Sequence, residues 1–241
     1  MRMASYELHL ASSRGAADHG WLKSFHTFSF ANFYDPKRIH FGALRVLNDD
    51  TVSGGMGFGQ HPHDNMEIIS IPLEGDLEHK DSMGNTTVIQ SGDIQVMSAG
   101  TGIYHSEYNR NKDATVKFLQ IWIFPNKKNV TPRYDQITLN PADRVNKFEQ
   151  ILSPNPEDAG VWIYQDAWFH IGKFDTGVSA EYGIKKAGNG LYVFVLRGEV
   201  TVDGQALATR DGLGIRDAAS VSFSEMSQDS EILLMEVPMQ L

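Results

Sequence analysis

The amino-acid sequence predicts an all-β protein made of two tandem β-barrels. Three observations support this fold class. Strand-like segments dominate the 241 residues, turn signals separate them, and one pattern of strand, turn and strand occurs twice. Many short strands at regular spacing are typical of β-barrels and β-sandwiches.

The predicted strands are short segments rich in β-branched and aromatic residues. They cover residues 41–47, 66–73, 94–97, 116–124, 191–196 and 231–237. Residues 81–85 (DSMGN) are typical of a hairpin loop, and Asp203-Gly204 is typical of a tight two-residue turn. Residues 141–152 have a helical period, which predicts one short helix in a connecting segment.

The internal repeat relates residues 68–85 to residues 192–204. In each copy an apolar strand runs into Leu-charged-Gly, and a second strand and a turn follow. Between residues 125 and 158 the chain becomes polar and contains several Pro and Asn residues, which is typical of a domain boundary. We therefore expect an N-terminal metal-binding barrel over residues 1–135 and a second barrel without metal ligands over residues 136–241.

Composition narrows the classes of function. The formal net charge of −9 disfavours direct binding to nucleic acid, because it repels phosphate backbones. The chain has no cysteine, so a metal ion would need nitrogen and oxygen ligands. No apolar stretch approaches the roughly 20 residues of a membrane helix, and the N-terminus lacks a signal-peptide pattern. These features predict a cytoplasmic protein that does not bind membranes.

Two short segments concentrate the residues that could bind a metal. Residues 55–67 (GMGFGQHPHDNME) contain His61, His63 and Glu67 at even spacing, which would place them on one face of an extended strand. His105 and Glu107 share a face in the same way. If both strands line one barrel, three imidazoles and one or two carboxylates converge, and such a set suits divalent Fe, Mn, Ni, Cu or Zn. Spacing alone allows either glutamate to be the fourth ligand.

These segments resemble the two motifs of the cupin superfamily, with the turn before the third histidine lengthened. A longer set of matches resembles the pirin family of bicupins. It includes HGWLKSFHTFSFANFYDP (residues 19–36), HKDSMGN (79–85), MSAGTGIYHSEYN (97–109) and TPRY (131–134). The resemblance is dense from about residue 14 to residue 134 and thinner towards the C-terminus.

The resemblance implies one divalent metal per chain, most commonly Fe(II), with Mn, Ni, Cu and Zn as alternatives. The implied ligands are His61, His63, His105 and Glu107. Glu67 occupies the ligand position of many other cupins and here becomes a hydrogen-bonding carboxylate near the metal.

The resemblance also implies quercetin 2,3-dioxygenase activity, with a small aromatic substrate and dioxygen as reactants. A flavonol would bind through its 3-hydroxyl as the conjugate base, and Glu107 or Glu67 would take the proton. The alternative is a regulatory protein that interacts with a partner according to the redox state of its metal.

Other side chains receive simpler predictions. Apolar residues that would line the first barrel and accept a planar ligand are Met97, Phe118 and Trp122. The second barrel is expected to be filled by Tyr192, Phe194 and Phe223. His79 lies next to a charged hairpin and is expected to be solvated.

Overall fold

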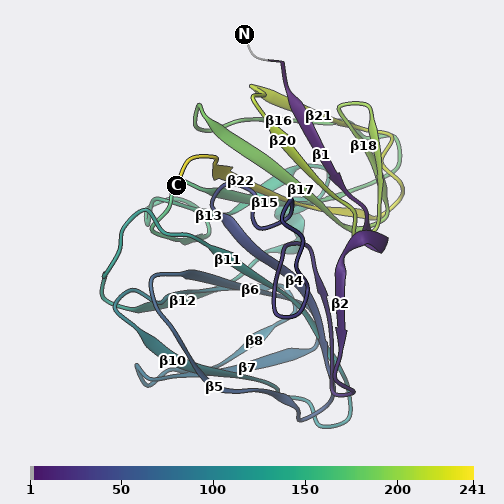
Figure 1. Ribbon diagram of the computed structural model, residues 1–241. Coiled ribbons are helices and arrows are strands. Elements are labelled where there is room, and N and C mark those ends of the chain that lie inside the picture. The colour runs from purple at the N-terminus through teal and green to yellow at the C-terminus, as the bar shows by residue number, and fades with distance from the viewer. Residues whose placement is uncertain (1–2) are drawn as a thin grey trace.

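The structure is a computed structural model that describes residues 3–241. It contains two β-barrels, each formed by a seven-stranded and a four-stranded sheet that face each other (Figure 1). The large sheet of the N-terminal barrel has the order β12 (Arg133–Thr138), β9 (Asp93–Ser98), β6 (Glu67–Glu74), β11 (Val116–Ile123), β4 (Leu44–Val52), β3 (Leu22–His26) and β2 (Gly15–Asp18). Its small sheet has the order β5 (Gly57–His63), β10 (Ile103–Asn109), β7 (Asp76–Asp81) and β8 (Thr86–Gln90).

The C-terminal barrel repeats this plan. Its large sheet has the order β1 (Ser5–His9), β20 (Gly212–Arg216), β17 (Asn189–Arg197), β22 (Ser230–Pro238), β15 (Trp168–Phe174), β13 (Phe148–Ser153) and β14 (Val161–Trp162). Its small sheet has the order β16 (Ala180–Gly183), β21 (Ser220–Ser224), β18 (Glu199–Val202) and β19 (Gln205–Ala208). Two short 3₁₀ helices, η1 (Ala11–Ser13) and η2 (Pro141–Arg144), complete the elements.

The two large sheets pack against each other and bury the largest apolar core. Ile69 and Ile121 of the N-terminal sheet belong to the same buried cluster as Phe169 and Met235 of the C-terminal sheet. Because side chains alternate along a strand, the opposite face of each of these strands points into its own barrel. Sheet-on-sheet packing therefore joins the domains and leaves the interior face of β6 and β11 free to line a site.

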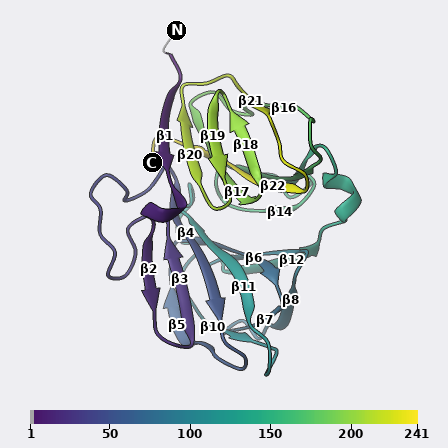
Figure 2. The ribbon, with the colours of Figure 1, turned by 90° about the vertical axis from the view of Figure 1, so that its right-hand side faces the viewer.

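The first strand belongs to the barrel of the other half. β1 pairs antiparallel with β20, and Tyr6 lies opposite Ile215. The chain then passes through η1 into β2 and β3, which join the N-terminal sheet (Figure 2). The domain boundary after residue 135 stays a prediction. The pairing of β1 with a strand of the C-terminal barrel was not predicted from the sequence.

The predicted strands and turns are found, most of them within two residues of the expected bounds, whereas the strand expected over residues 41–47 is β4, which runs from Leu44 to Val52. Asp203 and Gly204 both have positive φ (45° and 80°) between β18 and β19, as a two-residue hairpin requires. The repeated glycines Gly75 and Gly198 also correspond, because each adopts a positive φ (76° and 84°) directly after the long strand of its barrel. The internal repeat in the sequence therefore reflects a repeated structural unit.

The helix predicted over residues 141–152 is wrong over most of that range. Only η2 is helical, with the Asn140 side chain accepting a hydrogen bond from the backbone N–H of Ala142. Phe148 instead starts β13, which pairs with β15, and its ring packs 4.9 Å from the ring of Phe174. A ready sheet partner and a buried aromatic contact outweigh a weak helical period.

The prediction for the second barrel is correct for one aromatic residue and wrong for two. Phe223 lies in the buried cluster of the C-terminal barrel. Tyr192 and Phe194 lie in the cluster between the large sheets instead. The barrel interior receives the alternate side chains of β17, such as Val193, because neighbouring residues on a strand point to opposite faces.

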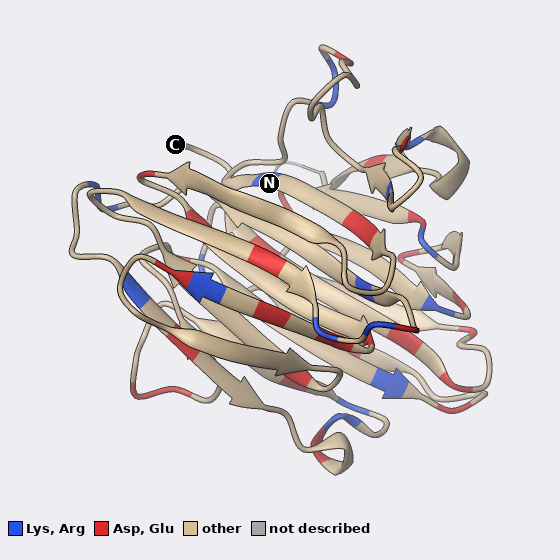
Figure 3. Cartoon of the chain, turned by 90° about the horizontal axis from the view of Figure 1, so that it is seen from below, with Lys and Arg blue, Asp and Glu red and all other residues tan. Residues whose placement is uncertain are grey.

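Charged residues of both signs are interspersed on the strands and loops seen from below in Figure 3. Within residues 3–241, no helix has the length and apolar character needed to cross a membrane.

Candidate metal centre

Two paired strands bring three histidines together. His61 and His63 lie on β5, which is the edge strand of the small sheet, and His105 lies on β10 directly opposite His61. The ring centroids are 4.4 Å apart for His61 and His105, and 4.9 Å apart for each pair that includes His63. One nitrogen of each ring lies within 4.8 Å of the others. Such a spacing is compatible with one ion bound by all three imidazoles.

Glycine makes this strand pairing possible. A Cβ atom at Gly57 would lie 2.2 Å from the carbonyl oxygen of Glu107 and 2.5 Å from the Cα of Tyr108. Only a residue without a side chain allows β5 to approach β10 so closely. A β-bulge between His105 and Glu107 also lies at this point, as bulges often do where a strand redirects side chains.

Two of the three histidines, His63 and His105, are in the chemical state that binds metals. Burial, together with the charges of the neighbouring histidines, lowers the pKa of His105 to about 3 and that of His63 to about 4. Both rings are therefore neutral at pH 7, and a neutral imidazole has the lone pair that a metal requires. His61 can donate from Nδ1 to the carbonyl oxygen of Gly59 at 2.7 Å, which leaves its Nε2 lone pair free.

His105 gives the strongest indication of a bound cation. It is 2% exposed, and both of its ring nitrogens are buried without a hydrogen-bond partner. Buried polar atoms without a partner are rare in native proteins and call for an explanation such as an ion. The residues of this cluster therefore fit a divalent transition metal.

Glu107 lies on the same face of β10 as His105 and is 2% exposed. Its Oε1 accepts a hydrogen bond from Ser70 at 3.1 Å, and its Oε2 accepts one from the Nε2 of Gln120 at 2.8 Å. A carboxylate oxygen of Glu107 lies within 4.8 Å of ring nitrogens of His105 and His79. The structure thus places Glu107 at the inner side of the histidine cluster, held by two neutral donors.

Glu67 lies elsewhere, and the single strand face predicted for His61, His63 and Glu67 is wrong. β5 ends at His63, and β6 begins at Glu67 after a turn in which Asn65 has a φ of 43°. The Oε2 of Glu67 accepts a hydrogen bond of 2.6 Å from Ser98. Burial raises the pKa of Glu67 to about 7, although this hydrogen bond and the charge of Arg133 oppose the increase.

The alternation on β6 explains why the two carboxylates separate. Ile68 packs with Met97 and Ile103 inside the N-terminal barrel, whereas Ile69 belongs to the core between the large sheets. Ser70, which reaches Glu107, lies on the face of Ile68, and Glu67 lies on the face of Ile69.

His79 is a buried neighbour of the histidine cluster that was not predicted from the sequence. It was expected to be solvated, but it is 0% exposed, and its Nε2 lies 3.0 Å from the Oδ2 of Asp81. Its ring centroid lies 5.4 Å from that of His105 and 4.9 Å from that of Tyr134. The available signal was the alternation on β7, where Leu77 and His79 are buried between more exposed charged neighbours.

Aromatic side chains form one wall beside the histidines. The ring of Trp122 lies 4.9 Å from that of His63, edge to face, and 5.5 Å from that of Phe30. The Nε1 of Trp122 is buried without a hydrogen-bond partner. Of the three lining residues predicted, Trp122 and Met97 border this end of the barrel, whereas Phe118 belongs to a separate cluster.

Comparisons with known proteins show to which family this chain belongs. The Pirin family model matches residues 8–123, and the model of the quercetinase C-terminal cupin domain matches residues 150–237. A protein of Escherichia coli (strain K12) named quercetin 2,3-dioxygenase is 44% identical over 231 residues, which cover 96% of this chain and 98% of the relative. A pirin-like protein of Caulobacter vibrioides is 40% identical and covers 92% and 95% of the two chains. This chain belongs to the pirin family.

Solved structures confirm the fold of this pirin. The crystal structure of the bacterial pirin YhhW from Escherichia coli, in complex with nickel(II), matches it with a TM-score of 0.91 and 42% identity, over 97% of this chain and 99% of that chain. The expected all-β bicupin, with two tandem cupin barrels, is therefore correct. The metal in that relative is nickel, so the expectation of iron for this pirin stays a prediction.

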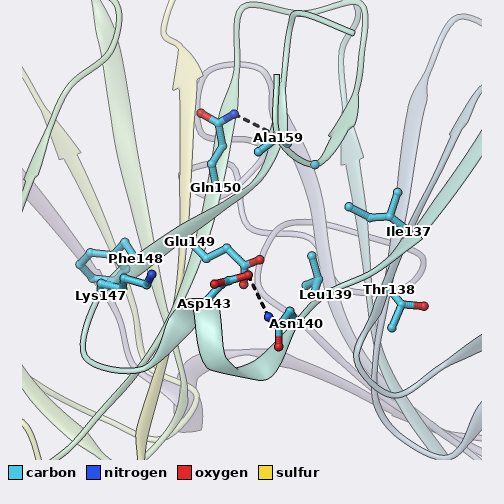
Figure 4. Close-up of a pocket in the computed structure, with 11 residues that line it drawn as sticks. Ile137, Thr138, Leu139, Asn140, Asp143, Lys147, Phe148, Glu149, Gln150 and Ala159 are labelled. Carbon is cyan, nitrogen blue, oxygen red and sulfur yellow. Dashed lines mark hydrogen bonds between the residues drawn. The ribbon is translucent and has the colours of Figure 1, made fainter. Parts of the chain in front are cut away.

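A separate pocket of about 410 Å³ lies where residues 137–140 approach residues 147–150 (Figure 4). Its polar lining includes Asp143, Lys147 and Glu149, and none of the clustered histidines borders it. The pocket is therefore distinct from the candidate metal centre.

Proposed function

We propose that this pirin is a metal-dependent dioxygenase that cleaves flavonols such as quercetin. His61, His63, His105 and Glu107 hold one divalent transition metal in this proposal, with iron as the expected ion and nickel as the first alternative. The observation that carries it concerns the buried His105. Its ring lies next to two other imidazoles, and neither of its ring nitrogens has a hydrogen-bond partner. The names of the relatives support the reaction, because two relatives from Escherichia coli are called quercetin 2,3-dioxygenase.

A metal held by these residues would supply Lewis-acid activation of the flavonol. The chain supplies orientation and proton transfer. Gln120 and Ser70 hold the Glu107 carboxylate at the inner side of the cluster, where it can take the proton of the flavonol 3-hydroxyl. The sequence allows Glu67 the same role, but its carboxylate lies on the face of β6 opposite to Ser70, so we assign proton transfer to Glu107.

The burial of the four candidate ligands indicates the side from which a substrate would reach the metal centre. His61 and His63 are half-buried on the edge strand β5, whereas His105 and Glu107 are buried behind them. A planar substrate would therefore approach past β5 and lie against Trp122. The buried indole N–H of Trp122 can donate to one of its oxygen atoms.

The test is oxygen uptake by iron-loaded protein with quercetin, followed with an oxygen electrode together with loss of the flavonol absorbance. We expect uptake that requires both metal and flavonol and that is lost in His105→Ala. The matched control is His170→Ala, which removes a buried histidine of the other barrel. Fully metal-loaded protein that consumes no oxygen with several flavonols would overturn the proposed reaction and favour a redox-sensitive interaction protein.

A further inference from the structure

His79 and Asp81 lie behind the candidate ligands, on the strand next to them. β7 pairs with β10, so that Asp81 is opposite His105 and His79 is opposite Glu107. Both side chains are shielded from solvent, with 1% and 0% of their side-chain surface exposed. This pair therefore faces the inner side of the centre, away from the entrance at β5.

The hydrogen bonds of Asp81 determine the tautomer of His79. The Oδ1 of Asp81 accepts from the backbone N–H groups of Met83 and Asn85, and its Oδ2 accepts from the Asn85 side chain at 2.8 Å. Although burial alone raises the pKa of Asp81, the hydrogen bonds from Asn85 and His79 hold it below its ordinary value. An ionised carboxylate only accepts, so the Nε2 of His79 is the donor in the 3.0 Å contact. In this tautomer the lone pair of the imidazole is on Nδ1, and that atom is buried without a hydrogen-bond partner.

His105 lacks a hydrogen-bond acceptor for the ring nitrogen that would not bind the metal. A neutral imidazole that gives one lone pair to a metal has its proton on the other nitrogen, and metal-binding histidines almost always donate that proton to an acceptor. His61 meets this requirement through the carbonyl of Gly59. His105 has no such partner among the described residues, and the ring of His79, with its unused Nδ1 lone pair, lies 5.4 Å away between centroids. A straight N–H···N bond of about 3 Å between two imidazoles gives a centroid distance of roughly 5 Å.

We propose that His79, anchored by Asp81, is a positioning residue that accepts the free N–H of His105 and so fixes which nitrogen of His105 faces the metal. This inference rests on the metal centre of the proposed function but not on the flavonol as its substrate. Removal of such a partner typically weakens metal binding by about 10- to 100-fold while the ligand set is kept. The distinguishing expectation is weaker binding with an unchanged number of imidazole ligands.

The experiment measures Ni(II) affinity by competition with a chelator and counts imidazole ligands by X-ray absorption. The test variant is His79→Phe, which keeps an aromatic ring against Tyr134 but has no acceptor. His79→Asn is the rescue variant, because its amide oxygen can lie near the position of Nδ1 and accept from His105. His170→Phe is the matched control, since it makes the same substitution at a buried histidine of the other barrel.

We expect an affinity about 10- to 100-fold lower in His79→Phe, partial recovery in His79→Asn, no change in His170→Phe, and three imidazoles throughout. Asp81→Asn should also weaken binding, because an amide can donate to His79 and favour the wrong tautomer. It tests the inference even if His79→Phe does not fold, as judged by circular dichroism and thermal melting. Wild-type affinity in both His79→Phe and Asp81→Asn would overturn the inference, as would loss of one imidazole in His79→Phe, which would make His79 a direct ligand. Failure of the wild-type protein to bind Ni(II) would instead overturn the metal centre itself.

Discussion

The carboxylate of Glu67 accepts a hydrogen bond of 2.6 Å from the hydroxyl group of Ser98, on the face of β6 that is turned away from the histidines. Ser70, three residues further along β6, reaches Glu107 on the other face. Two glutamates that both looked like ligands in the sequence are thus separated by one sheet. The separation lets metal binding and protein stability be tested independently.

The first prediction compares the two carboxylates directly. Glu107→Gln should lower metal content and affinity, because it removes the negative charge next to His105 while it keeps the size of the side chain. Glu67→Gln should leave metal binding within about twofold of the wild-type value, since its carboxylate contacts Ser98. Elemental analysis and Ni(II) titration of both purified variants measure the difference. The reverse order would mean that Glu67 is the fourth ligand.

The location of Glu67 shows what the sequence could and could not predict. Even spacing implies a common face only while the strand is unbroken, and here Asn65 adopts a left-handed conformation that ends it. His61, His63 and His105 were expected together because each pair lies on one strand or on strands of one barrel. The alternation on β7 could have predicted that His79 is buried, but not that it lies beside His105, since only the pairing of β7 with β10 brings the two together.

The second prediction concerns the pH dependence of stability. The pKa of Glu67 rises from an ordinary value of 4.5 to about 7, chiefly because the carboxyl group is buried. The folded state then retains a proton that the unfolded state has released, so the free energy of unfolding falls as the pH rises from about 4.5 to about 7. The cost of ionising Glu67 in the folded protein is on the order of 3 kcal/mol.

Glu67→Gln cannot ionise and should lose this part of the pH dependence. Relative to the wild-type protein, its free energy of unfolding should increase by a few kcal/mol, on the order of 2–3, between pH 5 and pH 8. Urea denaturation of metal-free protein at both pH values measures the change. Asp50, whose pKa is also raised to about 7 by burial, is present in both proteins and cancels in the comparison. Parallel pH profiles for the two proteins would contradict the prediction.

Fold prediction succeeded where the local pattern and the tertiary structure agree. The glycines after the long strands, Gly75 and Gly198, which the repeat matches to each other, occupy equivalent positions and both have positive φ. It failed where pairing with a distant strand determines the local structure. Phe148 is in a strand because β13 pairs with β15. The pairing of β1 with β20 was not predicted for the same reason, since nothing within residues 5–9 specifies a partner strand about 200 residues away.

The third prediction concerns substrate binding by Trp122. Trp122→Phe keeps an aromatic ring beside His63 and Phe30 but removes the buried N–H that has no partner in the protein. If that group donates to the flavonol, the variant should bind it about 2- to 10-fold more weakly, as expected for one neutral hydrogen bond. Anaerobic titration of the Ni(II)-loaded proteins with quercetin measures this, and metal affinity should stay unchanged. Equal quercetin affinity in the two proteins would show that the N–H does not contact the substrate.

The last prediction is that the C-terminal barrel binds no transition metal. His170 is the only histidine after His105, and its ring lies 4.9 Å from that of Tyr182 inside the second barrel. The nearby buried carboxylate of Glu236 already accepts hydrogen bonds from Tyr182, Asn189 and two backbone N–H groups, so it has little capacity left for an ion.

A variant in which His61, His63 and His105 are all changed to alanine should therefore contain no stoichiometric metal by elemental analysis. The wild-type protein should contain one metal per chain, and His170→Ala should match it. Because one imidazole and a carboxylate that is already saturated cannot replace a three-histidine set, loss of the N-terminal site should not be compensated by the second barrel. Retention of one metal per chain by the triple variant would show that the second barrel has a site of its own.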